Sequence, residues 1–331
     1  MGNTVEKQNP PKSVIQVRGL KKYFPVQKGL FSKVRAWVKA VDDVSFEINR
    51  GETFGLVGES GCGKTTITKC ILLMEKPTAG TVFFDGHDIT SLKGDDFVHY
   101  RRSIQVVFQD PTSALNPRMR VEDIVREPII AHERMPRRVT RGRVIQVLEE
   151  VGLSPSSAQL FPHEFSGGQR QRIAIARALA PSPACIVFDE PVSALDVSIR
   201  AQILNLLCDL QKKENLTFLV IAHDLAVIKH VSTRIGVMYL GKLVEIADSE
   251  DLYARPLHPY TQALLSAALP SHPDQKRDEI ILSGEVPSPL NPPSGCRFHP
   301  RCPYAKVKCS RIEPVLRDAG PGHKVACEST G

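Results

Sequence analysis

The sequence predicts an α/β fold in which a parallel or mixed sheet is covered by helices. Short apolar runs of strand length alternate with helical runs, and a glycine-rich turn joins the first such strand to the first such helix. Buried parallel strands are continuous apolar runs, and each is followed by a crossover helix. The expected strands are Thr53–Val57, Cys185–Phe188 and Thr217–Ile221, and the expected helices are Thr65–Met74, Val197–Lys212 and Leu225–His230.

Two further strands are expected ahead of this alternation. Val14–Val17 is a short apolar run, and Ala40–Ile48 carries apolar residues at alternate positions, which is the period of a half-buried strand. The stretch between them, Gln27–Val38, mixes basic and apolar residues and is interpreted as a hairpin insertion.

The sequence pattern changes between Ser113 and Gln159, and the new pattern predicts a helical subdomain. Helices are expected at Val121–Arg126 and Arg143–Val151, separated by polar and proline-containing connections without a good strand. A third helix is expected at Gln169–Ala180. We therefore place a helical subdomain at about 113–180, inserted in the α/β core.

The composition changes once more after Tyr260, where proline becomes frequent and regular periodicity disappears. We place a boundary between Arg255 and Pro270. The expected organisation is an α/β domain at 14–260, followed by an irregular C-terminal extension at 261–331.

Composition limits the class of protein. Hydrophobic residues make up 42% of the 331 residues and charged residues 24%, which is ordinary for a soluble globular chain. No apolar run has the roughly eighteen residues that a spanning helix needs, and Met1–Lys12 lacks the apolar core of a signal peptide. We expect a cytoplasmic protein that works at a membrane only through a separate partner. The net charge of +7 is dispersed, which favours a solvated basic face over a nucleic-acid site.

A phosphate-binding turn is predicted where the segment Gly58–Thr65 reads G-x-x-x-x-G-K-T between a strand and a helix. Glycine lets the backbone curl so that its N–H groups converge on phosphate oxygens, and the helix presents its positive end to the same anion. Lys64 is expected to reach the β- and γ-phosphates, and the Thr65 hydroxyl to bind Mg²⁺. The nucleotide-binding residues expected here are Gly58, Glu59, Ser60, Gly61, Cys62, Gly63, Lys64, Thr65 and Thr66.

Two acids follow the apolar strand Cys185–Phe188. Asp189 is placed to hold the Mg²⁺ hydration shell, and Glu190 to polarise an attacking water. An apolar run followed by Asp-Glu is a weak signal alone, but it is strong behind a phosphate-binding turn. These two motifs predict nucleotide chemistry and fit a kinase, a helicase or a GTPase equally well.

The segment Phe165–Gln169 decides between these classes. Its sequence is FSGGQ, and it precedes a helix rich in Ala, Ile and Arg, so Ser166 is a predicted N-cap and two bare glycines open the helix. This pentapeptide, ahead of an apolar Asp-Glu strand, resembles the signature of the ATP-binding cassette family. Phe165 stands where the family most often has Leu. A P-loop kinase would leave the motif unexplained.

Other residues then match the family in chain order, over Val14 to about Pro270. Tyr23 resembles the aromatic residue that stacks on adenine, and Gln109 the glutamine that senses the γ-phosphate, binds Mg²⁺ and couples to the membrane subunit. Ser193–Asp196 resembles the loop that crosses the dimer, and His223 the histidine that contacts the γ-phosphate.

The resemblance implies an ATPase that works as a head-to-tail dimer with two ATP molecules at its interface. Catalysis would fall to Glu190, His223 and Gln109, and Mg²⁺ binding to Thr65, Gln109 and Asp189. Ser166, Gly167, Gly168 and Gln169 would close the site of the opposite subunit. The implied partners are a second, paralogous ATPase, two integral membrane permeases and, indirectly, a solute-binding protein, with the chain peripheral on the cytoplasmic face of the cell membrane. No nucleic acid is expected.

The C-terminal segments Tyr253–Leu264 and Pro287–Cys296 resemble those of oligopeptide and dipeptide importer ATPases, and the insertion near Tyr23–Phe31 resembles the F-type member of the paired ATPases. Peptide import is therefore the expected function. Nickel importers share this element, so nickel or another small solute stays open as cargo. A cassette ATPase that acts on nucleic acid would suit the positive charge but not this tail.

Four of the eight cysteines, Cys296, Cys302, Cys309 and Cys327, crowd the last segment among Pro, Arg and Lys. A reducing compartment argues against disulfides, and thiolates near cations are metal ligands by chemistry. In the family that the chain resembles, matching cysteines can hold an iron–sulfur cluster, here expected as 4Fe–4S. The spacing leaves zinc and free thiols open.

Overall fold

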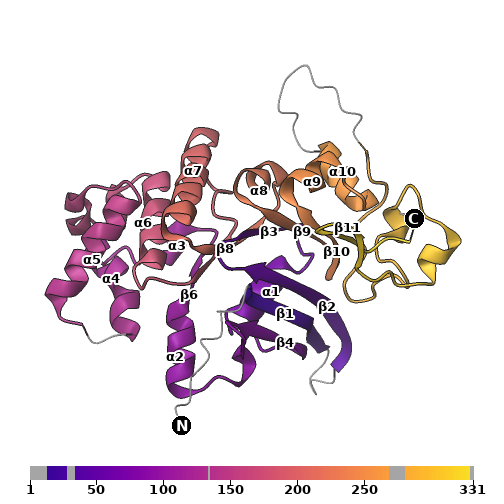
Figure 1. Cartoon of the computed structure of the whole chain (residues 1–331), viewed down its shortest axis with the longest axis horizontal. Helices are drawn as coiled ribbons and strands as arrows, with labels where there is room; N and C mark the ends of the chain where they lie inside the picture. The colour runs from indigo at the N-terminus through magenta and orange to yellow at the C-terminus, as the bar shows by residue number, and fades with distance from the viewer. Residues whose placement is uncertain (1–12, 28–33, 133–134, 268–279, 329–331) are drawn as a thin grey trace, which may run out of the picture.

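The computed structural model describes residues 13–27, 34–132, 135–267 and 280–328 (Figure 1). Over these residues the strands form an eight-stranded mixed sheet, in the order β11-β12-β10-β9-β3-β8-β7-β6, and a four-stranded antiparallel sheet, in the order β2-β1-β4-β5. Helices α4, α5 and α6 gather at one end of the molecule and the C-terminal residues at the other, with the large sheet between them. The predicted α/β class is confirmed.

One part of the large sheet is parallel and extends to its edge at β6. It comprises β3 (Thr53–Val57), β8 (Thr217–Ala222), β7 (Cys185–Asp189), β6 (Ile104–Val107) and β9 (Arg234–Tyr239). The three strands expected here from the sequence are present and buried, whereas β6 and β9 were not predicted. The carboxyl ends of parallel strands meet at one edge, which is where ligands bind in such sheets.

Side chains from the two faces of the sheet enter two separate cores. Phe218 and Val220 of β8 pack in the core that contains α7 (Val197–Glu214) and α8 (Leu225–Val231). Leu219 and Ile221 pack in the other core, which contains α1 (Lys64–Ile71). Helix α1 ends at Ile71, before the expected Met74, because Leu73 adopts a left-handed backbone with φ 53°.

The small sheet covers the α1 side of the molecule. It is formed by β1 (Ser13–Gln27), β2 (Val34–Asn49), β4 (Ala79–Phe84) and the short β5 (His87–Asp88). The first two strands run far beyond the predicted Val14–Val17 and Ala40–Ile48 and pair as far as Gln27 and Val34. Of the predicted hairpin insertion, Gln27 and residues 34–38 are therefore strand, while residues 28–33 lie outside the described residues.

The chain between β5 and β7 contains α2 (Gly94–Ser103), α3 (Pro111–Ala114), α4 (Val121–His132), α5 (Arg137–Glu150) and α6 (Gly167–Leu179). The expectation that α4 ends at Arg126, ahead of Pro128, was wrong. The helix continues because Ile129, one residue after the proline, is buried in the core shared with α6. Tertiary packing outweighs local helix propensity here.

The C-terminal region is less irregular than predicted. After β10 (Lys242–Asp248), α9 (Ser249–Ala254) and α10 (Pro259–Ala267), the chain returns in β11 (Arg317–Gly320) and β12 (His323–Val325), and β12 pairs antiparallel with β10. The fully buried His323 holds β12 against β10 and α9. Its Nε2 lies 2.7 Å from Glu245 Oε1, and its Nδ1 lies 2.7 Å from Asp251 Oδ2. Residues 268–279, which include one end of the expected boundary, lie outside the described residues.

The buried imidazole of His258, in the connection between α9 and α10, makes stability depend on pH. Its Nδ1 accepts the Tyr260 N–H at 3.1 Å, and burial lowers its pKa from 6.5 to about 3. As the pH falls below 6.5, the unfolded chain gains a proton that the folded chain does not. The free energy of unfolding therefore falls by up to about 1.4 kcal/mol per pH unit.

We expect the His258→Asn variant to lose less stability in acid, because the asparagine Oδ1 can accept the same N–H without titrating. Between pH 7 and pH 5, urea unfolding of the unmodified chain should show about 2 kcal/mol more loss than unfolding of the variant. Equal losses in the two proteins would show that His258 is not the group responsible.

Candidate active site

The glycine-rich turn joins β3 to α1 at the carboxyl edge of the large sheet. Its backbone takes positive φ at Gly58 (152°), Gly61 (78°) and Gly63 (110°). A Cβ on Gly63 would lie 2.2 Å from Ala40 O, and one on Gly58 would lie 2.2 Å from Met238 O. Both conformation and space therefore require glycine at these two positions, and the turn is held close against β2 and β9.

Lys64, the first residue of α1, extends back across this turn. Its buried Nζ donates to Gly58 O at 2.6 Å and to Glu59 O at 3.1 Å. Thr65 is exposed at the start of the helix, while Cys62 is buried, and burial raises the pKa of its thiol. The turn thus presents a fixed ammonium and a helix N-terminus, which together suit an anionic phosphate chain.

Two of the three predicted catalytic residues contact the carboxylate of the third, Glu190. Gln109 Nε2 donates to Glu190 Oε2 at 2.9 Å, and His223 Nδ1 lies 3.2 Å from Glu190 Oε1. They follow β6, β7 and β8, so neighbouring strands deliver them to the same edge. Glu190 also has a positive φ of 49°, a strained backbone for this residue type, and its N–H donates to Ile221 O at 2.9 Å.

Asp189, the last residue of β7, carries a carboxyl whose pKa is raised by burial and by the neighbouring Glu190, while Lys64 lowers it. Two adjacent carboxylates are costly to bury as anions unless a cation is shared between them. Mg²⁺ prefers oxygen ligands, so the pair and the Thr65 hydroxyl suit that ion.

Tyr23 lies in β1 opposite Lys39 of β2. Its hydroxyl donates to Asp42 Oδ1, and burial together with Asp42 raises the pKa of the phenol. Asp42 in turn accepts from the buried Arg297 of the C-terminal region. The tyrosine that was predicted to stack on adenine is therefore held by a hydrogen bond rather than by packing alone.

The predicted signature residues open α6 in the helical region. Ser166 Oγ accepts from the Gln169 N–H at 3.3 Å, and Gln169 Oε1 accepts from the Ser166 N–H at 3.0 Å, which forms a capping box. A Cβ on Gly168 would lie 2.4 Å from Ile199 Cγ2 of α7, whereas one on Gly167 would meet only Leu195 Cδ2 at 3.7 Å. Gly168 is thus needed for helix packing, and Gly167 is not.

Two residues of the C-terminal half contact the turn without having been predicted. Tyr260 Oη accepts the Glu59 N–H at 2.9 Å, and Arg301 Nη1 donates to Glu59 Oε2 at 2.9 Å. They stand 201 and 242 residues along the chain from Glu59. No spacing in the sequence signals contacts of this range.

The four C-terminal cysteines line one cavity of about 20 Å³, together with Phe298 and His258. Burial raises the pKa of Cys296 to about 11 and also raises that of Cys302. Nevertheless, among the residues that the structure describes, no group of three or more His, Cys, Asp or Glu side chains is spaced to hold a metal ion. The structure brings the four thiols together but does not itself support the predicted iron–sulfur cluster.

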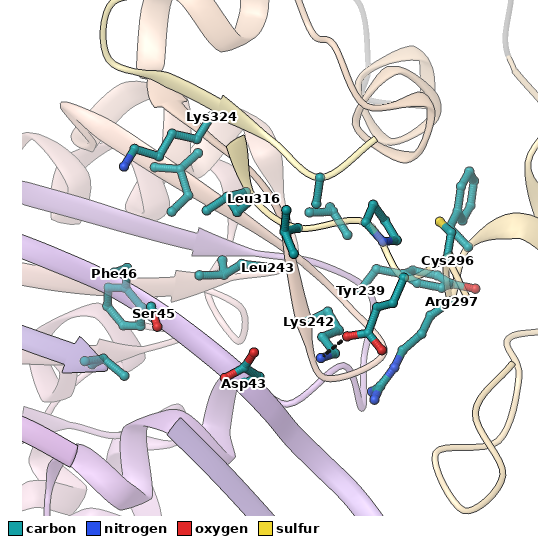
Figure 2. A pocket seen from close by; sticks show the side chains of 18 of the residues that line it. Asp43, Ser45, Phe46, Tyr239, Lys242, Leu243, Cys296, Arg297, Leu316 and Lys324 are labelled. Atoms are coloured by element: carbon teal, nitrogen blue, oxygen red, sulfur yellow. Dashed lines mark ion pairs between the residues drawn. The ribbon is translucent and has the colours of Figure 1, made fainter. Parts of the chain in front are cut away.

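A larger cavity of about 580 Å³ separates the β1–β2 hairpin from β10 and the C-terminal segment (Figure 2). An ion pair between Lys242 and Glu313, 2.5 Å apart, crosses its edge, and Arg297 lies nearby beside Cys296. These contacts tie the C-terminal segment to the core.

Comparison with known proteins shows the family of this chain. The family model for ABC transporters matches residues 41–193, and the model for the oligopeptide/dipeptide transporter C-terminal region matches residues 244–309. The oligopeptide transport ATP-binding protein AppF of Bacillus subtilis is 51% identical over 95% of this chain and 97% of its own length. The dipeptide transport ATP-binding protein DppF of Haemophilus influenzae is 46% identical over 99% of both chains.

Solved structures give the same result for the fold. The dimeric bacterial ABC transporter cassette MJ0796 aligns with a TM-score of 0.62 at 31% identity, over 71% of this chain and 98% of its own. A post-hydrolysis state of MJ0796, dimeric and bound to ADP and Pi, aligns with the same TM-score at 30% identity, over the same shares of the two chains.

The chain belongs to the ATP-binding cassette family, among the oligopeptide and dipeptide transport ATP-binding proteins. It is an ATPase that uses ATP and Mg²⁺. In the described part of the chain, no helix has the length and apolarity to cross a bilayer.

The two signature glycines make a matched pair for mutation. Gly168→Ala should lower the free energy of unfolding by about 1–3 kcal/mol, because its methyl group overpacks against Ile199. Gly167→Ala should change stability by no more than about 0.5 kcal/mol but should lower ATP hydrolysis, because the methyl group would stand on the face predicted to close the opposite site. Thermal melts and ATPase assays of both variants test this. Equal destabilisation by the two would contradict it.

Proposed function

We propose that this chain hydrolyses ATP to power the import of short peptides through a membrane transporter. The observation that carries the proposal is the convergence of Gln109, Glu190 and His223 beside the turn that holds Lys64. The peptide cargo is supported by the match of residues 244–309 to the oligopeptide/dipeptide transporter C-terminal region and by relatives with that function in their names.

The proposed reaction converts ATP and water to ADP and phosphate. The backbone N–H groups of the turn and Lys64 bind the β- and γ-phosphates, and Tyr23 stacks on the adenine. Glu190 accepts a proton from the attacking water and orients it in line with the bond that breaks. His223 and Gln109, both in contact with Glu190, hold that carboxylate toward the γ-phosphate.

The Mg²⁺ ion would be held by Thr65, Gln109 and Asp189 and would neutralise charge on the phosphate oxygens. Before the ion binds, burial and the neighbouring negative charge of Glu190 raise the pKa of Asp189, because both disfavour the charged form of its carboxyl. The two neighbouring carboxylates therefore offer the cation a negatively charged site.

Ser166–Gln169 are proposed to act on the opposite nucleotide. The N–H groups at the start of α6 and the uncrowded Gly167 suit an anion approaching from another subunit. We propose a dimer with a paralogous ATPase, bound to two membrane permeases on the cytoplasmic face and served by a solute-binding protein.

The Glu190→Gln variant tests the catalytic proposal. It keeps the side-chain shape but removes the proton acceptor, so hydrolysis should fall by roughly 10²–10⁴-fold while ATP stays bound. Retained radiolabelled ATP and phosphate release measure the two effects. Glu214→Gln, an exposed carboxylate at the end of α7, is the control and should hydrolyse ATP normally. Near-normal turnover in Glu190→Gln would contradict the assignment.

We further propose that the cysteine cavity binds an iron–sulfur cluster. Four thiols around one cavity supply the donor set that such clusters use. Because burial raises the pKa of Cys296 and Cys302, these thiols stay protonated until a metal displaces their protons.

Metal analysis of anaerobically purified protein tests this proposal. Iron and acid-labile sulfide should be present in equal amounts, and Cys302→Ser should lose both. Cys208→Ser, which changes a cysteine outside the cavity, should retain them. Zinc alone, or folded protein without metal, would contradict the cluster.

A further inference from the structure

The short segment Cys296–Cys302 connects the cysteine cavity to the nucleotide site. Cys296 and Cys302 line the cavity, and two arginines between them point into the core. Arg297 is buried and donates to Asp42 Oδ2 and to Leu240 O. Arg301 is also largely buried and donates to both carboxylate oxygens of Glu59, at 2.9 and 3.2 Å. One segment of seven residues thus carries two of the cavity's thiols and two core contacts.

These two arginines reach opposite ends of the predicted nucleotide site. Asp42, held by Arg297, also accepts the hydroxyl of Tyr23, the predicted adenine platform. Glu59, held by Arg301, is the second residue of the phosphate-binding turn, and its carbonyl accepts from Lys64 Nζ at 3.1 Å. Displacement of the segment would therefore disturb the base end and the phosphate end together.

A second path leads from the cavity to the same turn. His258 and Pro259 line the cavity, and the next residue, Tyr260, accepts the Glu59 N–H. Tyr260 packs edge-on against Tyr239, at 4.7 Å between ring centroids, and its ring is tilted against that of Phe298 at 5.4 Å. Phe298 itself lines the cavity, so three buried rings fill the space between the thiols and Glu59.

We infer that Arg301 and Tyr260 are positioning residues for the phosphate-binding turn. Through them, a change in the cysteine cavity, such as the loss of a thiol, alters the affinity for ATP. The inference rests on ATP binding at this turn. Its physical basis is that interior packing transmits displacement, since buried side chains have little room to absorb it. A charge-assisted bond between Arg301 and Glu59 is also stronger than a neutral one, so its geometry matters for the turn.

The first test measures binding of a fluorescent ATP analogue with Mg²⁺ to the full chain. Arg301→Gln and Tyr260→Phe should each raise the Kd roughly tenfold, which corresponds to about 1.4 kcal/mol, and Arg301→Lys should recover part of the loss. The KM of the assembled transporter for ATP should rise with little change in kcat. Arg311→Gln, an exposed arginine of the same C-terminal region, is the matched control and should bind normally.

The second test is a double-mutant cycle on Kd between Cys302→Ser and Arg301→Gln. Cys302→Ser should weaken binding several-fold in the unmodified chain and less than twofold in the Arg301→Gln background, because both changes act through the same contact. Additive effects, or a Cys302→Ser variant with normal affinity, would overturn the link to the cavity.

Thermal melts of the variants distinguish a loss of affinity caused by a displaced turn from one caused by unfolding. Tyr260→Phe keeps the ring packing and removes only the hydroxyl, so it should weaken binding without an equal loss of Tm. Normal affinity in both Arg301→Gln and Tyr260→Phe, or affinity that falls only where Tm falls, would overturn this inference but not the proposed function. Failure of the unmodified chain to bind ATP would contradict the proposed function as well.

Discussion

Parallel pairing of β6, β7, β8 and β3 is the constraint on which the site depends. The register places Val107 beside Phe188 and Asp189 beside Ile221, so all these strands end together. The residues that follow them must then meet at one edge of the sheet. This is why Gln109 and His223, 114 residues apart by number, each lie close to Glu190. The turn after β3 joins the same edge because β3 pairs directly with β8.

Backbone strain at this edge is supported by the sheet beneath it. Glu190 holds a left-handed conformation that a glutamate rarely adopts, at a cost of order 1–3 kcal/mol. Its N–H bond to Ile221 continues the pairing of β7 with β8, so the neighbouring strand fixes the residue in place. The strained backbone in turn directs the carboxylate to both Gln109 and His223. Rigid strands thus keep a geometry that a flexible loop would lose.

The C-terminal region forms part of the nucleotide site's support. Strand β12 continues the large sheet, and His323 holds it between two carboxylates. Arg297 and Arg301 then reach back to β2 and to the phosphate-binding turn. A segment that reads as proline-rich and irregular therefore contributes buried ionic contacts, and buried charges are stable only when they are paired in this way.

The sequence by itself determined the local features. Glycines at 58 and 63, Lys64, the acids Asp189 and Glu190 and the Ser166 cap were all predictable, because each belongs to a motif of a few neighbouring residues. Only the tertiary structure decided the long-range features. The extension of α4 past Pro128 depends on burial of Ile129, and the contacts of Tyr260 and Arg301 with Glu59 cross more than 200 residues. The spacing of residues within a short stretch of sequence does not indicate such contacts, because they form only when the sheet brings distant segments together.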